Sequence, residues 1–271
     1  MYKEAMRGSF NPLDIFKINK YKLDDFKKNP THLRTFGTCI FCGSQGMGKT
    51  LSAVQYVLNL RKIYPRAILV SNVEIKSCPF NAYRGEDNEI YLTSNNQRID
   101  TAYILEASLN EGFEPINIEY SGLDDLKYIN NAEYGVIYLI DELHLELNSL
   151  ESKNISIEVM VEISQQRKQR KHIVGTSQVF MRLAKPLREQ IKDIIICRCI
   201  LGCIQFNKWI DGESVSEENG KINADVVGRF IFTHKLTMYS EYDTYCKMRR
   251  YNNEWKGTPI QNTLEYVKFE R

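Results

Sequence analysis

The chain has 271 residues, of which 43% are hydrophobic and 26% are charged. This composition is typical of a folded globular protein and excludes a largely disordered chain. The 36 Lys and Arg residues nearly balance the 34 Asp and Glu residues, and the resulting net charge of +2 excludes a polycation. Any contact with nucleic acid therefore needs a local basic patch.

Neither a membrane span nor a secretory signal is expected. The apolar run 194–206 is interrupted by Arg198 and is shorter than the ~18 residues that a membrane helix needs. Residues 1–10 lack the apolar core of a signal peptide, and the seven cysteines are an odd number, which favours a reducing compartment. We therefore expect a soluble, cytoplasmic protein.

Hydrophobic periodicity predicts alternating strands and helices after a polar first segment. Alternation of this kind favours an α/β fold with a mostly parallel central sheet flanked by helices. The stronger signals are a strand at 38–42, a helix at 49–64, strands at 67–71 and 136–140, a helix at 154–170, and strands at 173–176 and 193–200. The weaker signals are strands at 90–92 and 116–120 and a short helix at 123–129.

The last part of the chain is expected to add a small β appendage. Residues 211–221 are acidic and bounded by glycine, which predicts a surface loop. Residues 229–239 and 242–250 are expected to form two strands. The predicted parts are an arm or cap at 1–36, a core at 37–210 and an appendage at 211–271 that packs on the core.

A phosphate-binding loop, the P-loop, follows the first predicted strand. The segment Gly43–Thr50, GSQGMGKT, fits the pattern G-x-x-x-x-G-K-[ST] and precedes a predicted helix. Glycines let backbone N–H groups turn toward phosphate oxygens, and the helix dipole adds positive potential. Lys49 is expected to reach the β- and γ-phosphates of ATP, and Thr50 to ligate Mg²⁺. The residues expected to contact the nucleotide are Gly43, Ser44, Gln45, Gly46, Met47, Gly48, Lys49, Thr50 and Leu51.

Two acidic residues, Asp141 and Glu142, follow the apolar strand at 136–140. In P-loop proteins an Asp at the end of a neighbouring strand holds Mg²⁺, so Asp141 is the second expected metal ligand. The Glu142 carboxylate could orient and deprotonate a water aimed at the γ-phosphate, which predicts hydrolysis as well as binding. GTPases usually position this water with Gln, and a guanine-reading N-K-x-D motif is missing here.

A basic segment follows the predicted helix at 154–170. Residues 161–192 hold eight basic and two acidic residues, a net charge of +6, so the rest of the chain has a net charge of −4. Three explanations fit: an arginine that reaches the γ-phosphate of a neighbouring subunit, contact with a DNA backbone, or a solvated helix end. The residue pattern does not choose among them.

Gln178 closes the strand after this basic segment, in the sequence GTSQ. In a parallel sheet this end of the strand lies beside the P-loop and the acidic pair. A polar side chain there could sense the γ-phosphate, or it could be an ordinary polar residue at a strand end.

The cysteines are expected to be buried thiols and not zinc ligands. Cys39 and Cys42 lie three residues apart on one strand, so their side chains point to opposite faces. The spacing of Cys197, Cys199 and Cys203 is not a standard zinc pattern.

In this order the motifs resemble the Zot-like (zonula occludens toxin) branch of the FtsK/HerA motor ATPases, which includes phage assembly and genome-packaging ATPases. The resemblance covers about residues 36–200. The matching segments are GSQGMGKT at 43–50, RAILVSNVEI at 66–75, SGLDDLKYINNAEYGVIYLIDELH at 121–144 and QRKQRKHIVGTSQ at 166–178. The resemblance implies a P-loop NTPase fold of the additional-strand type, as in RecA and FtsK/HerA proteins.

The resemblance also implies roles and partners. Glu142 is similar to the catalytic base of the family, Gln178 to its polar sensor and Arg170 to an arginine finger that acts in trans, with Arg167 as the alternate. The implied assembly is a ring of subunits, a pentamer or hexamer, that moves DNA of unknown form by hydrolysing ATP. A phage portal or capsid vertex is a further implied partner, and the implied location is the host cytoplasm, the virion or the procapsid.

Three alternative functions stay open at this point. Zot-like proteins of filamentous phages continue into a membrane span and a further domain, whereas this chain ends at Arg271, which favours a packaging motor over an assembly and extrusion ATPase. Some deoxynucleoside kinases pair a P-loop with an Asp-Glu strand, but their zinc cysteines follow the acidic pair. A non-hydrolytic nucleotide switch or scaffold would not need Glu142.

Overall fold

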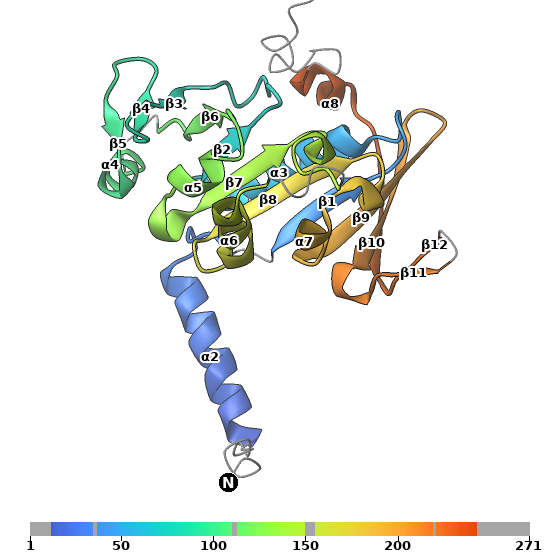
Figure 1. Ribbon diagram of the computed structural model, residues 1–271. Coiled ribbons are helices and arrows are strands. Elements are labelled where there is room, and N and C mark those ends of the chain that lie inside the picture. The colour runs from blue at the N-terminus through green and yellow to red at the C-terminus, as the bar shows by residue number, and fades with distance from the viewer. Residues whose placement is uncertain (1–11, 35–36, 110–112, 150–154, 219–220, 243–271) are drawn as a thin grey trace, which may run out of the picture.

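A computed structural model of the protein describes residues 12–34, 37–109, 113–149, 155–218 and 221–242. Its centre is an 11-stranded sheet with the order β13-β10-β9-β1-β8-β7-β2-β6-β3-β4-β5 (Figure 1). The strands of this sheet are β1 (Thr38–Cys42), β2 (Ile68–Ser71), β3 (Ala82–Arg84), β4 (Ile90–Leu92), β5 (Arg98–Ile99), β6 (Asn117–Glu119), β7 (Val136–Ile140), β8 (Lys171–Ser177), β9 (Ile191–Ile200), β10 (Ile204–Asp211) and β13 (Val226–Thr233). A separate hairpin pairs β11 (Ser216–Glu218) with β12 (Lys221–Asn223).

The strands at the middle of the sheet, from β9 to β6, run parallel to one another. Every residue of β1, β2, β7 and β8 is buried, which explains why β1, β2 and β7 have mostly apolar sequences, whereas β8 is apolar only at its centre. Strand β8 lies between β1, which leads into the P-loop, and β7, which ends at the acidic pair. The predicted α/β class with a mostly parallel sheet is confirmed.

Helices cover both faces of this sheet and make three layers. The long helix α3 (Lys49–Ile63) packs on one face, where its Leu51, Val54 and Val57 join Cys39 in one hydrophobic cluster. The opposite face carries α5 (Asp125–Tyr128), α6 (Ile157–Gln165) and α7 (Lys185–Arg188), and its cluster contains Cys42. Cys39 and Cys42 therefore lie on opposite faces of the sheet, as their spacing predicts.

Several elements differ from the sequence prediction. The helix expected at 154–170 ends at Gln165, and Arg170 has φ +52°, which no α-helix accommodates. The strand expected at 229–239 is β13 followed by α8 (Leu236–Glu241), and the loop expected at 211–221 contains β11. The strand expected at 242–250 lies outside the described residues, apart from Tyr242.

The region between β2 and β7 was the hardest to predict. Strands β3 and β5 and helix α4 (Thr101–Ala107) had no recognised signal, because all three are short. Strands β3, β4 and β5 pair in antiparallel fashion and form one edge of the sheet. Asp100 caps α4 by accepting a hydrogen bond from Tyr103 N (2.7 Å).

The amino-terminal helix α2 (Pro12–Lys28) projects away from the body of the molecule (Figure 1). None of its residues is buried. The chain rejoins the core at Leu33, which is buried and donates its N–H to Glu133 O (3.1 Å). Within the described parts of the chain, no helix combines the length and the hydropathy needed to cross a bilayer.

Candidate active site

The P-loop lies at the carboxyl end of β1, and two glycines let it turn closely against neighbouring strands. Gly43 N donates to Ser177 O at the end of β8 (3.3 Å), and a Cβ at Gly43 would lie 2.8 Å from Cys197 O. Gly48 has φ +74°, and a side chain there would collide with Gln205 of β10. The tight turn leaves the first N–H groups of α3 at the open edge of the sheet, where they can bind an anion.

Lys49 begins α3 and is only 6% exposed. Its ammonium group donates to the Ser44 carbonyl oxygen (3.3 Å), which is its only hydrogen bond or ion pair within the described residues. A buried cation with one neutral partner is costly unless an anion completes its surroundings. Lys49 is therefore placed as a phosphate ligand requires.

Thr50 and Asp141 meet at one point, although they are far apart in the sequence. Thr50 Oγ1 donates to Asp141 Oδ1 (2.8 Å), and Thr176 Oγ1 of β8 donates to the same oxygen (2.6 Å). Asn72 holds the Asp141 backbone by accepting from its N–H (2.8 Å) and donating to its carbonyl oxygen (3.0 Å). The ends of β2, β7, β8 and the start of α3 thus place a hydroxyl and a carboxylate together, which is a donor set that suits Mg²⁺.

Glu142 follows with an unusual backbone conformation. It has φ +53°, and its N–H donates to Thr176 Oγ1 (2.9 Å). Its Oε2 lies 3.2 Å from His144 Nδ1, but neither atom makes an aligned hydrogen bond to a described group, and both are buried. Burial lowers the pKa of His144, with Glu142 opposing the shift. A strained backbone that holds a carboxylate with a buried oxygen lacking an aligned hydrogen bond is often found at functional sites.

Gln178 lies beside the P-loop, as its position at the end of β8 predicts. Cys42 of β1 pairs in register with Ser177 of β8, so the residue after Ser177 adjoins the loop that begins at Gly43. The side chain of Gln178 is half-buried. No described group is hydrogen-bonded to it, and its role as a sensor stays a prediction.

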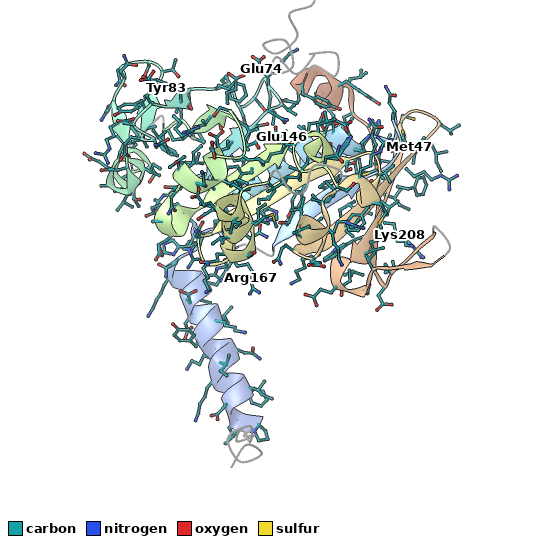
Figure 2. The ribbon with its side chains drawn as sticks, in the orientation of Figure 1. Met47, Glu74, Tyr83, Glu146, Arg167 and Lys208 are labelled. Atoms are coloured by element: carbon teal, nitrogen blue, oxygen red, sulfur yellow. The ribbon has the colours of Figure 1, made fainter. Side chains whose placement is uncertain are left out.

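The two candidate arginine fingers lie at the other end of the sheet. Arg170 precedes β8, and its Nη1 donates to the Leu33 carbonyl oxygen (2.9 Å). Arg167 is exposed, and its guanidinium group makes no hydrogen bond or ion pair with a described residue. Figure 2 shows Arg167 near the base of α2, well separated from Met47 of the P-loop. Neither arginine can therefore serve the P-loop of its own subunit, and only an action in trans stays possible.

The basic segment at 161–192 does not form a single patch. Lys171 is buried, where it bonds Glu162 (2.9 Å) and the Leu126 carbonyl oxygen (2.6 Å). Its exposed members are Arg167, Lys168, Arg182, Lys185 and Lys192. Part of the local positive charge is thus neutralised inside the fold, and only the exposed members can meet a phosphate backbone.

Strand β10 supports the P-loop from the side opposite to β8. Gln205 Nε2 donates to Met47 O (3.1 Å) and to Asn207 Oδ1 (2.8 Å), and Asn207 Nδ2 donates to Ser52 Oγ of α3 (3.1 Å). His234 Nε2 lies 3.0 Å from Gln205 Oε1, which extends the network to the end of β13. Buried amides that are satisfied in this way fix the loop in one position.

The residues present fit a bound magnesium–ATP complex. The P-loop turn is open to an anion, the Lys49 ammonium has one neutral partner, and the Glu142 carboxylate has a buried oxygen without a hydrogen bond. Lys49 would hold the phosphates, Thr50 and Asp141 the metal. Bound Mg²⁺ would neutralise charge on the phosphate oxygens during transfer.

Sequence reasoning missed three supporting residues. Asn72 and Thr176 position Asp141 and Glu142, and Gln205 holds the P-loop. The first two had a signal, because each is a polar residue at the carboxyl end of a buried strand. Gln205 had none, since nothing in its local sequence indicates that β10 lies beside the P-loop.

No protein-family model and no curated protein sequence matches the chain. Among solved structures, the N-terminal domain of zonular occludens toxin from Neisseria meningitidis is similar over 77% of this chain and 100% of its own, with 17% identity and a TM-score of 0.49. The DNA-packaging ATPase B204 from Sulfolobus turreted icosahedral virus is similar over 74% of this chain and 98% of its own (11% identity, TM-score 0.40). The genome packaging NTPase B204 from Sulfolobus turreted icosahedral virus 2, in complex with ATP-gammaS, is similar over 59% and 73% (12% identity, TM-score 0.36).

The first of these structures belongs to the Zot family that the sequence resembles. The strand order and the P-loop of this chain make it a P-loop NTPase of the α/β class, with β8 inserted between the P-loop strand and the Asp141 strand.

Proposed function

We propose that this protein is an ATP-hydrolysing motor that moves DNA, and that it packages a phage genome as a ring of five or six subunits. The observation that carries hydrolysis is the meeting of Lys49, Thr50, Asp141 and Glu142 at one edge of the sheet, although Thr50 and Asp141 are 91 residues apart. The DNA substrate and the ring rest on the resemblance to Zot-like motor ATPases. Portal or capsid contact, and a location in the host cytoplasm or on the procapsid, follow from the same proposal.

Each residue has a defined task in the proposed reaction. Lys49 binds the β- and γ-phosphates, while Thr50 and Asp141 orient the triphosphate through their metal-binding oxygens. Glu142, which directly follows Asp141 in the sequence, accepts a proton from the attacking water. Gln178, beside the P-loop, reports the state of the γ-phosphate, and Arg167 or Arg170 of a neighbouring subunit stabilises the transferring group.

The test is phosphate release measured with and without single- and double-stranded DNA. A motor should be stimulated by one DNA form, a kinase should require a nucleoside acceptor, and a switch should turn over slowly without responding to DNA. The Lys49→Ala variant gives the background rate. Its nucleotide affinity should fall by about 30-fold to 5,000-fold, because losing one member of a buried charge pair costs about 2–5 kcal/mol.

Lys62→Ala is the matched control for Lys49→Ala. Lys62 lies on the same helix, is exposed, and is at the end far from the P-loop. Its removal should leave binding and turnover unchanged. Wild-type protein that releases no phosphate with any nucleotide, metal or DNA would overturn the proposed function.

A further inference from the structure

Helix α2 carries an apolar stripe that the described part of its own chain leaves largely exposed. Ile15, Phe16, Leu23 and Phe26 fall within an arc of about 100° at 3.6 residues per turn, which is the width of a helix face that normally packs on a partner. All four are exposed, Phe16 to 71%. The other side of the helix carries most of the charged residues, with Tyr21 among them at 74% exposure.

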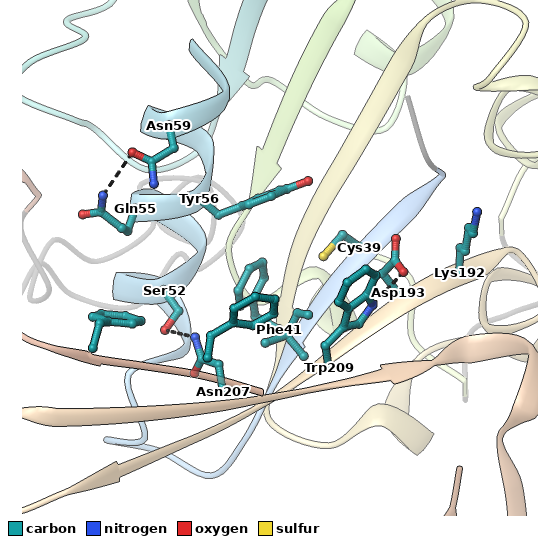
Figure 3. Close-up of a pocket in the computed structure, with 13 residues that line it drawn as sticks. Cys39, Phe41, Ser52, Gln55, Tyr56, Asn59, Lys192, Asp193, Asn207 and Trp209 are labelled. Carbon is teal, nitrogen blue, oxygen red and sulfur yellow. Dashed lines mark hydrogen bonds between the residues drawn. The ribbon is translucent and has the colours of Figure 1, made fainter. Parts of the chain in front are cut away.

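A second uncovered apolar surface lies on the face of the sheet that carries α3. Beyond the reach of α3, strands β1, β9, β10 and β13 form the floor of a groove of about 580 Å³, with α3 as its wall (Figure 3). The Trp209 and Phe230 rings stack here at 6.1 Å, and Phe230 is 51% exposed. The apolar lining consists mainly of Phe41, Tyr56, Ile195, Trp209, Phe230 and Phe232.

The two surfaces do not meet within one chain, because the end of α2 is fixed in a different direction. Arg34 forms an ion pair with Asp25 (3.1 Å) and stacks over the Phe26 ring (4.6 Å). Leu33, directly before Arg34, is buried and held by Arg170. This anchor directs α2 away from the sheet (Figure 1), so the groove that could receive the stripe belongs to another molecule.

Charge and size are compatible with this fit. Helix α2 holds five lysines and three aspartates, a net charge of +2. The groove is lined at one end by Lys192 and by Asp193, which accepts from Trp209 Nε1 (2.8 Å). Asp211 pairs with Asp193 in register and so faces the same side, which leaves this end acidic overall. The aromatic side chains of α2 would bury on the order of 300 Å², and the aliphatic ones add to this toward the ~800 Å² per partner of a specific interface.

We propose that α2 of one subunit docks its apolar stripe into the groove between α3 and β9–β10–β13 of a second copy of the chain. The contact joins two different surfaces, so each subunit offers one helix and one groove. Repeated contacts of this kind close a ring when the rotation permits. The proposal deepens the proposed function and rests on it for the ring, whereas the docking itself needs no ATP hydrolysis.

The first test measures self-association of the full chain by analytical ultracentrifugation. The double variant Phe16→Glu/Leu23→Glu places charge on the stripe and should weaken association at least about tenfold, as loss of an interface anchor does. Phe230→Glu in the groove should have the same effect. Tyr21→Glu is the matched control, because Tyr21 has a similar exposure on the opposite side of α2, and it should associate like wild type.

The second test locates the contact. A photo-cross-linking amino acid replaces Phe16 in unlabelled chains, which are mixed with ¹⁵N-labelled chains, and cross-linked peptides are identified by mass spectrometry. Links between chains that join position 16 to β10, β13 or α3 support the proposal. Links within one chain, links between two α2 helices, or wild-type protein that stays monomeric at every concentration would each overturn it.

Nucleotide binding separates this proposal from the proposed function. The Phe16→Glu/Leu23→Glu variant should bind a fluorescent ATP analogue as wild type does, because α2 lies far from the P-loop. DNA-stimulated hydrolysis by a protein whose assembly ignores both α2 and the groove would refute the docking and leave the motor intact. Docking in a protein that never hydrolyses ATP would support the docking and refute the motor. Binding of α2 to lipid vesicles in place of a second chain would also refute the docking.

Discussion

The parallel strands of the central sheet begin at one side of the molecule, the amino edge, and end at the other, the carboxyl edge. The two edges carry similar charged residues, but these residues differ in how fully their own chain supplies hydrogen-bond and ion-pair partners. At the carboxyl edge, the Lys49 ammonium has one neutral partner among the described residues, and a Glu142 oxygen has none that is aligned. At the amino edge, Lys171 is paired with Glu162, and Arg170 is bound to a backbone carbonyl. Both edges contain a charged residue at positive φ, Glu142 and Arg170 respectively.

The difference separates structural charges from functional ones. A buried charge that is satisfied by its own chain stabilises the fold, whereas one that lacks a partner must be satisfied by a ligand or it destabilises the protein. By this criterion the carboxyl edge is a binding site and the amino edge is an anchor for α2. The comparison also favours Arg167 over Arg170 as the arginine finger. Of the two guanidinium groups, only that of Arg167 is bound by no described residue.

The largest expected effect tests whether Arg167 at the amino edge stabilises the reaction at the P-loop of a neighbouring subunit. Arg167→Ala should lower turnover by about 10³–10⁵ if Arg167 is the finger. Mixing Arg167→Ala subunits with Lys49→Ala subunits should restore part of the activity, because an intact P-loop can then face an intact arginine. Steady-state phosphate release across mixing ratios measures this, and a purely additive result would argue against action in trans.

Arg170→Ala is the comparison variant for this experiment. It removes the hydrogen bond to the Leu33 carbonyl oxygen, so it should lower the free energy of unfolding by about 1–2 kcal/mol. Urea unfolding of both variants distinguishes the roles. If Arg170→Ala is as stable as wild type but inactive, and is rescued by mixing, then Arg170 is the finger.

The next effect tests the Glu142 carboxylate at the carboxyl edge. Glu142→Gln keeps the shape of the side chain but cannot accept the proton, so kcat should fall by about 10²–10⁴ while nucleotide affinity stays the same. Single-turnover hydrolysis and binding of a fluorescent ATP analogue measure the two quantities. Glu189→Gln on the exposed surface of the turn after α7 is the control, and normal hydrolysis by Glu142→Gln would refute the base assignment.

A further effect tests the amino edge as an anchor through the pH dependence of stability. His172 is buried between Gly37 O (2.8 Å from Nδ1) and the Tyr56 hydroxyl (3.0 Å from Nε2), and burial lowers its pKa to about 4. Between pH 6.5 and about 4 the unfolded chain therefore binds a proton that the folded protein does not. The free energy of unfolding should decrease by about 3 kcal/mol as the pH falls through this window.

Chemical unfolding at several pH values measures this dependence. His172→Gln cannot titrate in this range, so its stability should be flatter between pH 6.5 and 4 even if it is lower overall. An equal slope in both proteins would assign the pH dependence to other groups.

The carboxyl edge was largely predictable from sequence, and the reason is local. The P-loop glycines, Lys49, Thr50 and the strand that ends at Asp141 each carry their own signal, and parallel strands bring their carboxyl ends to one edge. Helix α6 was predicted too long because residues 166–170 contain no glycine or proline that would signal its end, whereas the chain turns there to enter β8. The strand expected at 229–239 ends at Thr233, where α8 follows in its place.

The sequence by itself therefore determined the α/β class, the P-loop and the acidic pair, because each depends on short-range spacing and on continuous burial of a strand. Only the tertiary structure decided that Gln205 supports the P-loop, that Arg170 is engaged by Leu33, and that α2 and the β10–β13 groove are both left uncovered by the described residues. The two hydrogen-bonded contacts join residues more than a hundred positions apart. No local pattern encodes them, since they depend on which strands become neighbours.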